Sequence, residues 1–145
     1  MDYQELNSVW EIKKEYDRET QRLKDLRLFA QPSSPPIDGM PHAPTPQSSK
    51  VESLATLIVE LETRLCELYA EWQCRQYQLV TALRNVHMKE LSHRVLIFRY
   101  ADCQSFNAIA KLLNFSRRYV MDLHEAGLRA LGLNVQSMIQ FQKTL

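Results

Sequence analysis

The feature that most constrains this chain is the position of its prolines. All six lie between residues 32 and 46, and none precedes or follows that window. Glycine, which also disfavours helices, occurs only three times in 145 residues. Proline removes a helical hydrogen bond and clashes with the preceding turn, so two long stretches without it are free to be helical. We therefore expect an all-α fold interrupted by one Pro-rich segment.

The proline window divides the chain into four parts. Residues 1–30 are rich in Glu, Lys, Arg, Gln and Leu and predict an N-terminal helix. Residues 31–50 read as a Pro-rich linker, or as a turn at residues 37–41 docked on a neighbouring segment. Residues 51–88 predict one long helix, and residues 89–145 predict a helical C-terminal domain that ends in a short additional helix.

The long predicted helix carries apolar residues at heptad spacing. Such spacing, sustained over several heptads, is typical of a coiled coil. A helix of this length needs a partner along its apolar seam, and the partner is the N-terminal helix, a second copy of the chain, or both. We expect a hairpin or rod that pairs into a homodimer or higher homo-oligomer through Leu54, Ile58, Leu61, Leu65, Leu68, Trp72 and Leu79.

Composition and spacing exclude several classes of function. The longest apolar run, residues 95–98, is too short to span a bilayer, and the N-terminus lacks the regions of a signal peptide. Cys66, Cys74 and Cys103 have no paired spacing and indicate reduced thiols. No glycine-rich phosphate loop, paired base and nucleophile, or metal-ligand spacing is present. We expect a cytoplasmic protein that is not an enzyme and has no cofactor, metal or membrane partner.

The formal net charge of +1 conceals a difference between two parts of the chain. Residues 51–83 carry two basic and five acidic side chains, whereas residues 84–131 carry eight basic and four acidic ones. A split of this kind indicates different partners for the two parts. The basic C-terminal third is therefore the part expected to meet a polyanion.

The same C-terminal third has the spacing of a helix-turn-helix. Ser105 can cap a short helix over residues 106–113, and Ser116 can cap a second helix that ends near residue 131. Asn114 tolerates the left-handed conformation of a sharp turn, and the small Ala110 lets two helices approach closely. The residues expected to face inward are Ile109, Leu113, Val120 and Leu123.

The outward face of the second predicted helix carries residue types that bind DNA. Arginine at the start of a helix can bind a guanine edge or a phosphate, and tyrosine can hydrogen-bond to phosphate. A capping serine offers a hydroxyl and a backbone N–H to the same group. Any amphipathic helix has a charged outer face, so the turn chemistry and Ala110 are what favour DNA binding here. The candidates are Ser116, Arg117, Arg118, Tyr119, Met121 and Asp122.

Three segments resemble region 4 of bacterial sigma factors. They are residues 91–100 (LSHRVLIFRY), 106–120 (FNAIAKLLNFSRRYV) and 128–131 (LRAL). The whole chain resembles a narrower group, the phage and prophage sigma-region-4-like transcriptional regulators of the ArpU and RinA type. In that group a Pro-rich stretch with a Gly-Met-Pro motif precedes a long charged helix, and residues 39–41 match the motif. The family usually has glycine in the turn where this chain has Asn114.

The resemblance implies a sequence-specific DNA-binding regulator that activates late or packaging genes of a phage in its bacterial host. It implies that the second helix enters the major groove, while Arg99 and Lys111 contact the DNA backbone from flanking helices. The expected partners are double-stranded DNA, further copies of the chain and the host RNA polymerase.

Two other functions fit the same sequence. Small-terminase proteins of phage DNA packaging also join a helix-turn-helix to an oligomerising helical part, although their DNA-binding part comes first. The chain can also be a protein-interaction module that acts on RNA polymerase, since the positive charge of its C-terminal third is modest. The mass in solution separates a ring of many subunits from a dimer.

Overall fold

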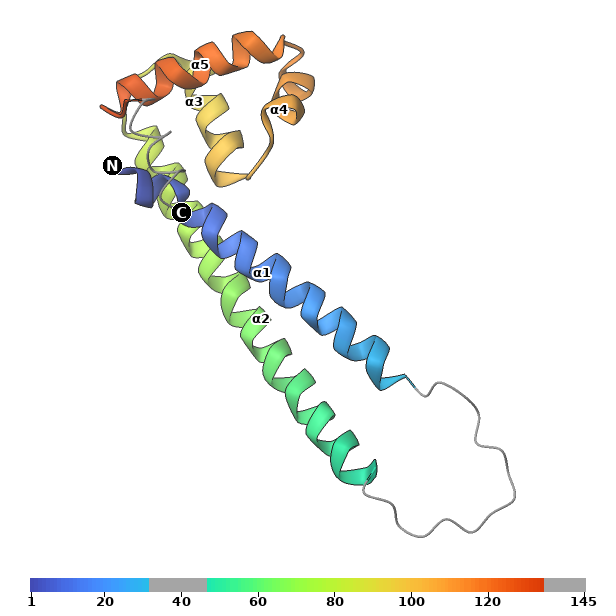
Figure 1. The fold of residues 1–145 in the computed structure, drawn as a ribbon. Helices are drawn as coiled ribbons and strands as arrows, with labels where there is room; N and C mark the ends of the chain where they lie inside the picture. The colour runs from blue at the N-terminus through green and yellow to red at the C-terminus, as the bar shows by residue number, and fades with distance from the viewer. Residues whose placement is uncertain (32–46, 135–145) are drawn as a thin grey trace, which may run out of the picture. The chain divides into compact units, whose positions relative to one another are not determined.

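The computed structural model describes residues 1–31 and 47–134, and all regular structure in these two stretches is helical (Figure 1). The all-α expectation is therefore confirmed for the described residues. The docked turn at residues 37–41 and the additional C-terminal helix lie outside them. In chain order the elements are α1 (Tyr3–Ala30), α2 (Gln47–Arg84), α3 (Glu90–Leu96), the π-helical turn η1 (Ile97–Ala101), α4 (Phe106–Leu113) and α5 (Arg117–Ala130).

Both ends of α2 lie four residues earlier than the expected range of residues 51–88. Its start, Gln47, falls inside the segment read as a linker, directly after the last proline of the window. At its other end the N–H groups of Asn85 and Val86 bond to carbonyls three residues back, at 3.2 and 3.1 Å, which closes the last turn. The predicted end of this helix was too late because Val86 continues the heptad spacing. Asn85, which precedes it, disfavours helical backbone, and α2 ends at Arg84.

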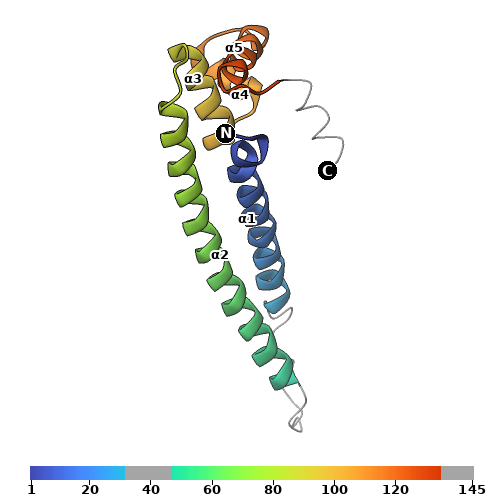
Figure 2. The ribbon, with the colours of Figure 1, turned by 90° about the vertical axis from the view of Figure 1, so that its left-hand side faces the viewer.

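The chain divides into two compact units, and both long helices contribute to each of them. One unit consists of Met1–Lys13 with Glu71–Leu145, and we call it the terminal unit. The other consists of Lys14–Ala70, and we call it the hairpin unit. Within each unit the α1 and α2 segments lie side by side and run in opposite directions (Figures 1 and 2). No helix among residues 1–31 and 47–134 is both long and apolar enough to cross a membrane.

In the hairpin unit, side-chain contacts fix the antiparallel pairing of the two helices. Glu15 accepts a hydrogen bond from Arg64 at 2.9 Å, and Arg27 forms an ion pair with Glu62. The rings of Tyr16 and Tyr69 lie 6.2 Å apart. Because these ion pairs are exposed, each contributes little, and the pairing depends mainly on apolar burial. The buried residues of this unit are Leu23, Leu61 and Leu68.

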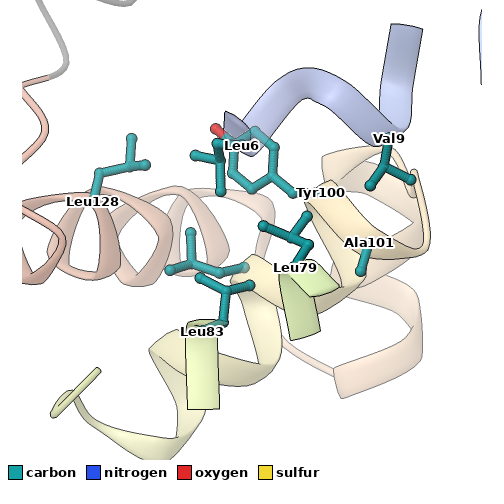
Figure 3. Packing of buried hydrophobic residues seen from close by; sticks show 8 residues of the cluster. Leu6, Val9, Leu79, Leu83, Tyr100, Ala101 and Leu128 are labelled. Carbon is teal, nitrogen blue, oxygen red and sulfur yellow. The ribbon is translucent and has the colours of Figure 1, made fainter. Parts of the chain in front are cut away.

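In the terminal unit, the start of the chain completes the core of its C-terminal half. Leu6 and Val9 of α1 are fully buried against residues from four other elements (Figure 3). The hydroxyl of Tyr3 donates a hydrogen bond to the carbonyl of Asn134 at 2.7 Å. The cluster, which we call the terminal core, consists of Leu6, Val9, Leu79, Leu83, Leu96, Tyr100, Ala101 and Leu128.

The π-helical turn η1 ends the α3 helix and changes the direction of the chain before α4. The N–H of Asp102 bonds to the carbonyl of Ile97, five residues back, at 3.1 Å. The Asp102 carboxylate accepts a hydrogen bond from Gln76 of α2 at 2.9 Å, and Cys103 adopts a left-handed φ of 54°. The wide turn is therefore anchored to α2 through Asp102.

Replacing Leu6 by alanine tests the contribution of α1 to the terminal core. Leu6 is 0% exposed, so removing its side chain leaves a cavity, and we expect Leu6→Ala to lower the free energy of unfolding by about 2–5 kcal/mol. Urea titration followed by tryptophan fluorescence measures it, since Trp10 and Trp72 pack on this core. Leu28→Ala, at a position 66% exposed in the same helix, is the control and should change stability by less than about 0.5 kcal/mol. Equal stability of both variants would contradict the assignment.

Candidate nucleic-acid interface

The two C-terminal helices α4 and α5 are joined by a three-residue turn that caps both. Ser105 accepts a hydrogen bond from the N–H of Ala108, and Ser116 accepts one from the N–H of Tyr119, each at 3.2 Å. Asn114 lies in the left-handed region, with φ 57° and ψ 42°. The N–H of Phe115 then bonds to the carbonyl of Ala110 at 3.0 Å, which satisfies the end of α4. Both predicted caps and the predicted turn conformation are confirmed.

A second buried cluster holds α5 by one side only. It joins α3, α4 and α5, and Phe106, Leu113 and Phe115 pack around its edge. The first turn of α5 therefore has one side in contact with the protein and the other in solvent. The buried residues are Val95, Ile109, Ala110, Val120 and Leu123.

The free side of α5 presents two arginines in its first turn. Arg117 and Arg118 are exposed and form no ion pair with any described residue. By contrast, Arg129 near the end of α5 is paired with Glu125 at 2.6 Å. The side chains of Ser116, Arg117, Arg118, Tyr119, Met121 and Asp122, together with Lys111 of α4, are all exposed. The ring of Phe115 meets that of Tyr119 edge-on, with centroids 5.0 Å apart.

Arg99 is placed differently from the other expected DNA-contacting residues. Its guanidinium lies between two rings, 4.9 Å from the centroid of Trp10 and 4.6 Å from that of Phe106. One terminal nitrogen donates to the carbonyl of Gln104 at 3.0 Å, and burial lowers the pKa of the side chain. The indole N–H of Trp10 donates to the Arg99 carbonyl at 2.7 Å. A phosphate contact by Arg99 stays a prediction, and it would compete with these contacts.

A buried pair, Tyr100 of η1 and His124 of α5, joins these two elements. The Tyr100 hydroxyl is hydrogen-bonded to Nε2 of His124 at 2.8 Å, and Phe106 meets the imidazole edge-on at 5.0 Å between centroids. Burial, with a further contribution from the Arg99 charge, lowers the pKa of His124 to about 4. Burial also raises the pKa of Tyr100. His124 is therefore neutral at physiological pH and belongs to the core that positions α5.

The residues expected to support pairing between copies lie on the side of α2 that faces α1. Three of them, Leu61, Leu68 and Leu79, are buried within the chain and have little surface left for a second copy. The other four, Leu54, Ile58, Leu65 and Trp72, are half-buried. In the structure the N-terminal helix α1 lies against this side of α2. A role of these residues in pairing between copies stays a prediction.

Two residues central to this region were not among those singled out in the sequence. Trp10 contacts Arg99 across 89 positions of the chain, and no local pattern connects the two. His124 falls at helical spacing from Val120 and Leu128, which was the available signal that it faces inward. Among the described residues, no group of His, Cys, Asp or Glu could hold a metal ion.

Comparison with known proteins adds no further assignment. No family model matches the chain, and neither curated proteins nor solved structures give a significant match.

The buried imidazole makes stability depend on pH. The pKa of His124 falls from an ordinary 6.5 to about 4 on folding, so the unfolded chain binds the proton more readily. The neutral His124 imidazole therefore favours the folded state fully above pH 6.5. As the pH falls toward 4, the free energy of unfolding decreases by about 3 kcal/mol. Urea unfolding between pH 7 and pH 4 measures this. His124→Gln does not titrate and should lose correspondingly less stability over the same range, whereas parallel pH profiles of the two proteins would refute the buried, neutral imidazole.

Proposed function

We propose that this chain is a sequence-specific DNA-binding transcriptional regulator of the phage sigma-region-4-like kind. In this proposal α4 and α5 form a helix-turn-helix, and the first turn of α5 enters the major groove of double-stranded DNA. The observation that carries the proposal is the pair of exposed arginines, Arg117 and Arg118, on a helix turn whose opposite side is packed on a buried cluster. Such support fixes the direction of the side chains before DNA is bound.

The distribution of charge around α5 supports the same proposal. Lys111, Arg117 and Arg118 are exposed without an ion-pair partner among the described residues, and so is Asp122, whereas Glu125 on the same face is paired with Arg129. Three cations against one anion give a modest attraction for phosphate. A single copy should therefore bind DNA weakly, and two linked copies should bind it much more tightly.

We further propose that the chain acts as a homodimer paired through α2. In a bacterial host it activates late or packaging genes, and it acts together with the RNA polymerase of that host. The acidic composition of residues 51–83 fits this division of roles, because a negatively charged segment is repelled by DNA and is free to bind protein.

A binding experiment on the upstream DNA of its own genome tests the interface. Fluorescence anisotropy with labelled duplex fragments should show that Arg117→Ala and Arg118→Ala each weaken binding by about 1–3 kcal/mol, or roughly 5- to 150-fold, where the arginine binds a base. Where the contact is to phosphate, the salt slope of log K should fall by about 0.9 for each arginine.

Arg129→Ala is the matched control, since it removes the same side chain from the ion-paired end of the same helix. It should leave affinity and salt slope nearly unchanged. Unaltered binding by the Arg117→Ala, Arg118→Ala double variant would overturn the proposed interface.

A further inference from the structure

The side of α2 that faces away from α1 is exposed along most of the helix. Positions 59, 63, 66, 70, 73 and 77 alternate steps of four and three residues, so they lie along one line of the helix surface. That line is opposite to Leu61, Leu68 and Leu79, which are buried toward α1. Because α2 is a single helix, the order of these positions follows from helix geometry alone. We call this surface the back face, and its residues are Val59, Thr63, Cys66, Ala70, Gln73 and Tyr77, all exposed.

The back face carries no charge between Glu52 and Arg84, which lie on the same line at its two ends. Neighbouring exposed positions such as Ala55, Thr56, Cys74 and Thr81 are uncharged as well. The charged residues of the helix lie beside this face or toward α1, and two of them, Glu62 and Arg64, form ion pairs with α1. They are Glu60, Glu62, Arg64, Glu67, Glu71 and Arg75. Solvent-facing sides of helices ordinarily carry mixed charge, so about five uncharged turns are unusual for a surface that stays in water.

Two large side chains on the back face are strongly exposed. Val59 is 60% exposed and Tyr77 is 74% exposed, and they lie on either side of smaller residues. A tyrosine that projects from an uncharged helix face is typical of a contact residue between proteins, where its ring is buried and its hydroxyl stays hydrated.

We propose that the back face binds the back face of a second copy of this chain, with the two α2 helices antiparallel. The two helices cross near residue 68, so that each Tyr77 packs over the partner's Val59. Each Cys66 then lies beside the partner's Ala70. Such a contact is self-complementary, as a twofold axis requires. Since α1 covers the opposite side of α2, the second copy displaces none of the described residues.

The charges at the two ends of the back face select the antiparallel direction. In that register Glu52 lies beside the partner's Arg84, and Arg84 lies beside the partner's Glu52. A parallel pair would place Glu52 against the partner's Glu52, and Arg84 against the partner's Arg84. Exposed ion pairs add little to the affinity of the dimer, but like charges placed side by side disfavour the parallel arrangement. The end charges therefore determine the direction of the two helices more than the affinity between them.

This inference rests on the pairing through α2 that the proposed function includes, but it assigns the contact to a different face of the helix. Mass in solution tests it without DNA, so its failure leaves the test of Arg117 and Arg118 intact. Light scattering should give a mass of two chains, twice 17.0 kDa. Gln73→Arg introduces a charge on the back face and should weaken the dimer at least tenfold. Gln78→Arg, the same substitution at an exposed position on the charged flank, should leave it unchanged.

A monomeric wild-type chain, a larger ring, or a dimer insensitive to Gln73→Arg would overturn the proposal. Unchanged circular dichroism of both variants shows that a loss of mass is not a loss of folding.

Cross-linking tests the direction of the two helices. In a background with Cys66→Ser, Cys74→Ser and Cys103→Ser, one protein carries Thr63→Cys and another carries Gln73→Cys. The two are unfolded, refolded together and oxidised with diamide. Antiparallel pairing predicts disulfide-linked dimers in the mixture and not in either protein alone, since position 63 faces position 73 of the partner. Cross-linking of each protein with itself, or no cross-linking in any sample, would overturn the proposed register.

Discussion

The stacking of Arg99 between Trp10 and Phe106 is the contact on which the terminal unit depends. It joins the N-terminal helix to η1 and to the first residue of α4. Phe106 then meets the ring of His124 in α5, and His124 bonds to Tyr100. A guanidinium enclosed by aromatic faces keeps its charge while losing water, which a cation–π arrangement makes tolerable. These ring contacts connect α1, through η1 and α4, to α5, the helix that carries the exposed arginines.

This arrangement separates the roles of basic residues that look alike in the sequence. Arg99, Arg117 and Arg118 all lie in the basic third of the chain. Arg99 is held by two rings and a carbonyl, whereas Arg117 and Arg118 extend from the first turn of α5 into solvent. Burial of the His124 ring is the main reason that its pKa is lowered and the imidazole is neutral, and the nearby Arg99 charge lowers the pKa further, because a second cation beside it would be unfavourable.

Local sequence signals predicted local structure well. The helix caps at Ser105 and Ser116 and the left-handed Asn114 follow from short-range backbone chemistry, and all three are present. The apolar spacing of α2 correctly indicated one buried side, at Leu61 and Leu68, but could not tell whether α1 or another copy covers it. The contact of Trp10 with Arg99 could not be predicted, because it depends on how distant segments pack. The DNA-contacting face and pairing between copies stay predictions.

The terminal core draws residues from both ends of the described chain, and this affects how the protein folds as it is made. Leu6 and Val9 leave the ribosome long before Leu128, with which they share a cluster. The amphipathic start of α1 must therefore wait, partly exposed, until α5 has been synthesised. Contacts of such high sequence separation also slow closure of the core compared with that of a helical hairpin. A shortened chain that ends before α5 would leave this apolar surface uncovered and open to aggregation.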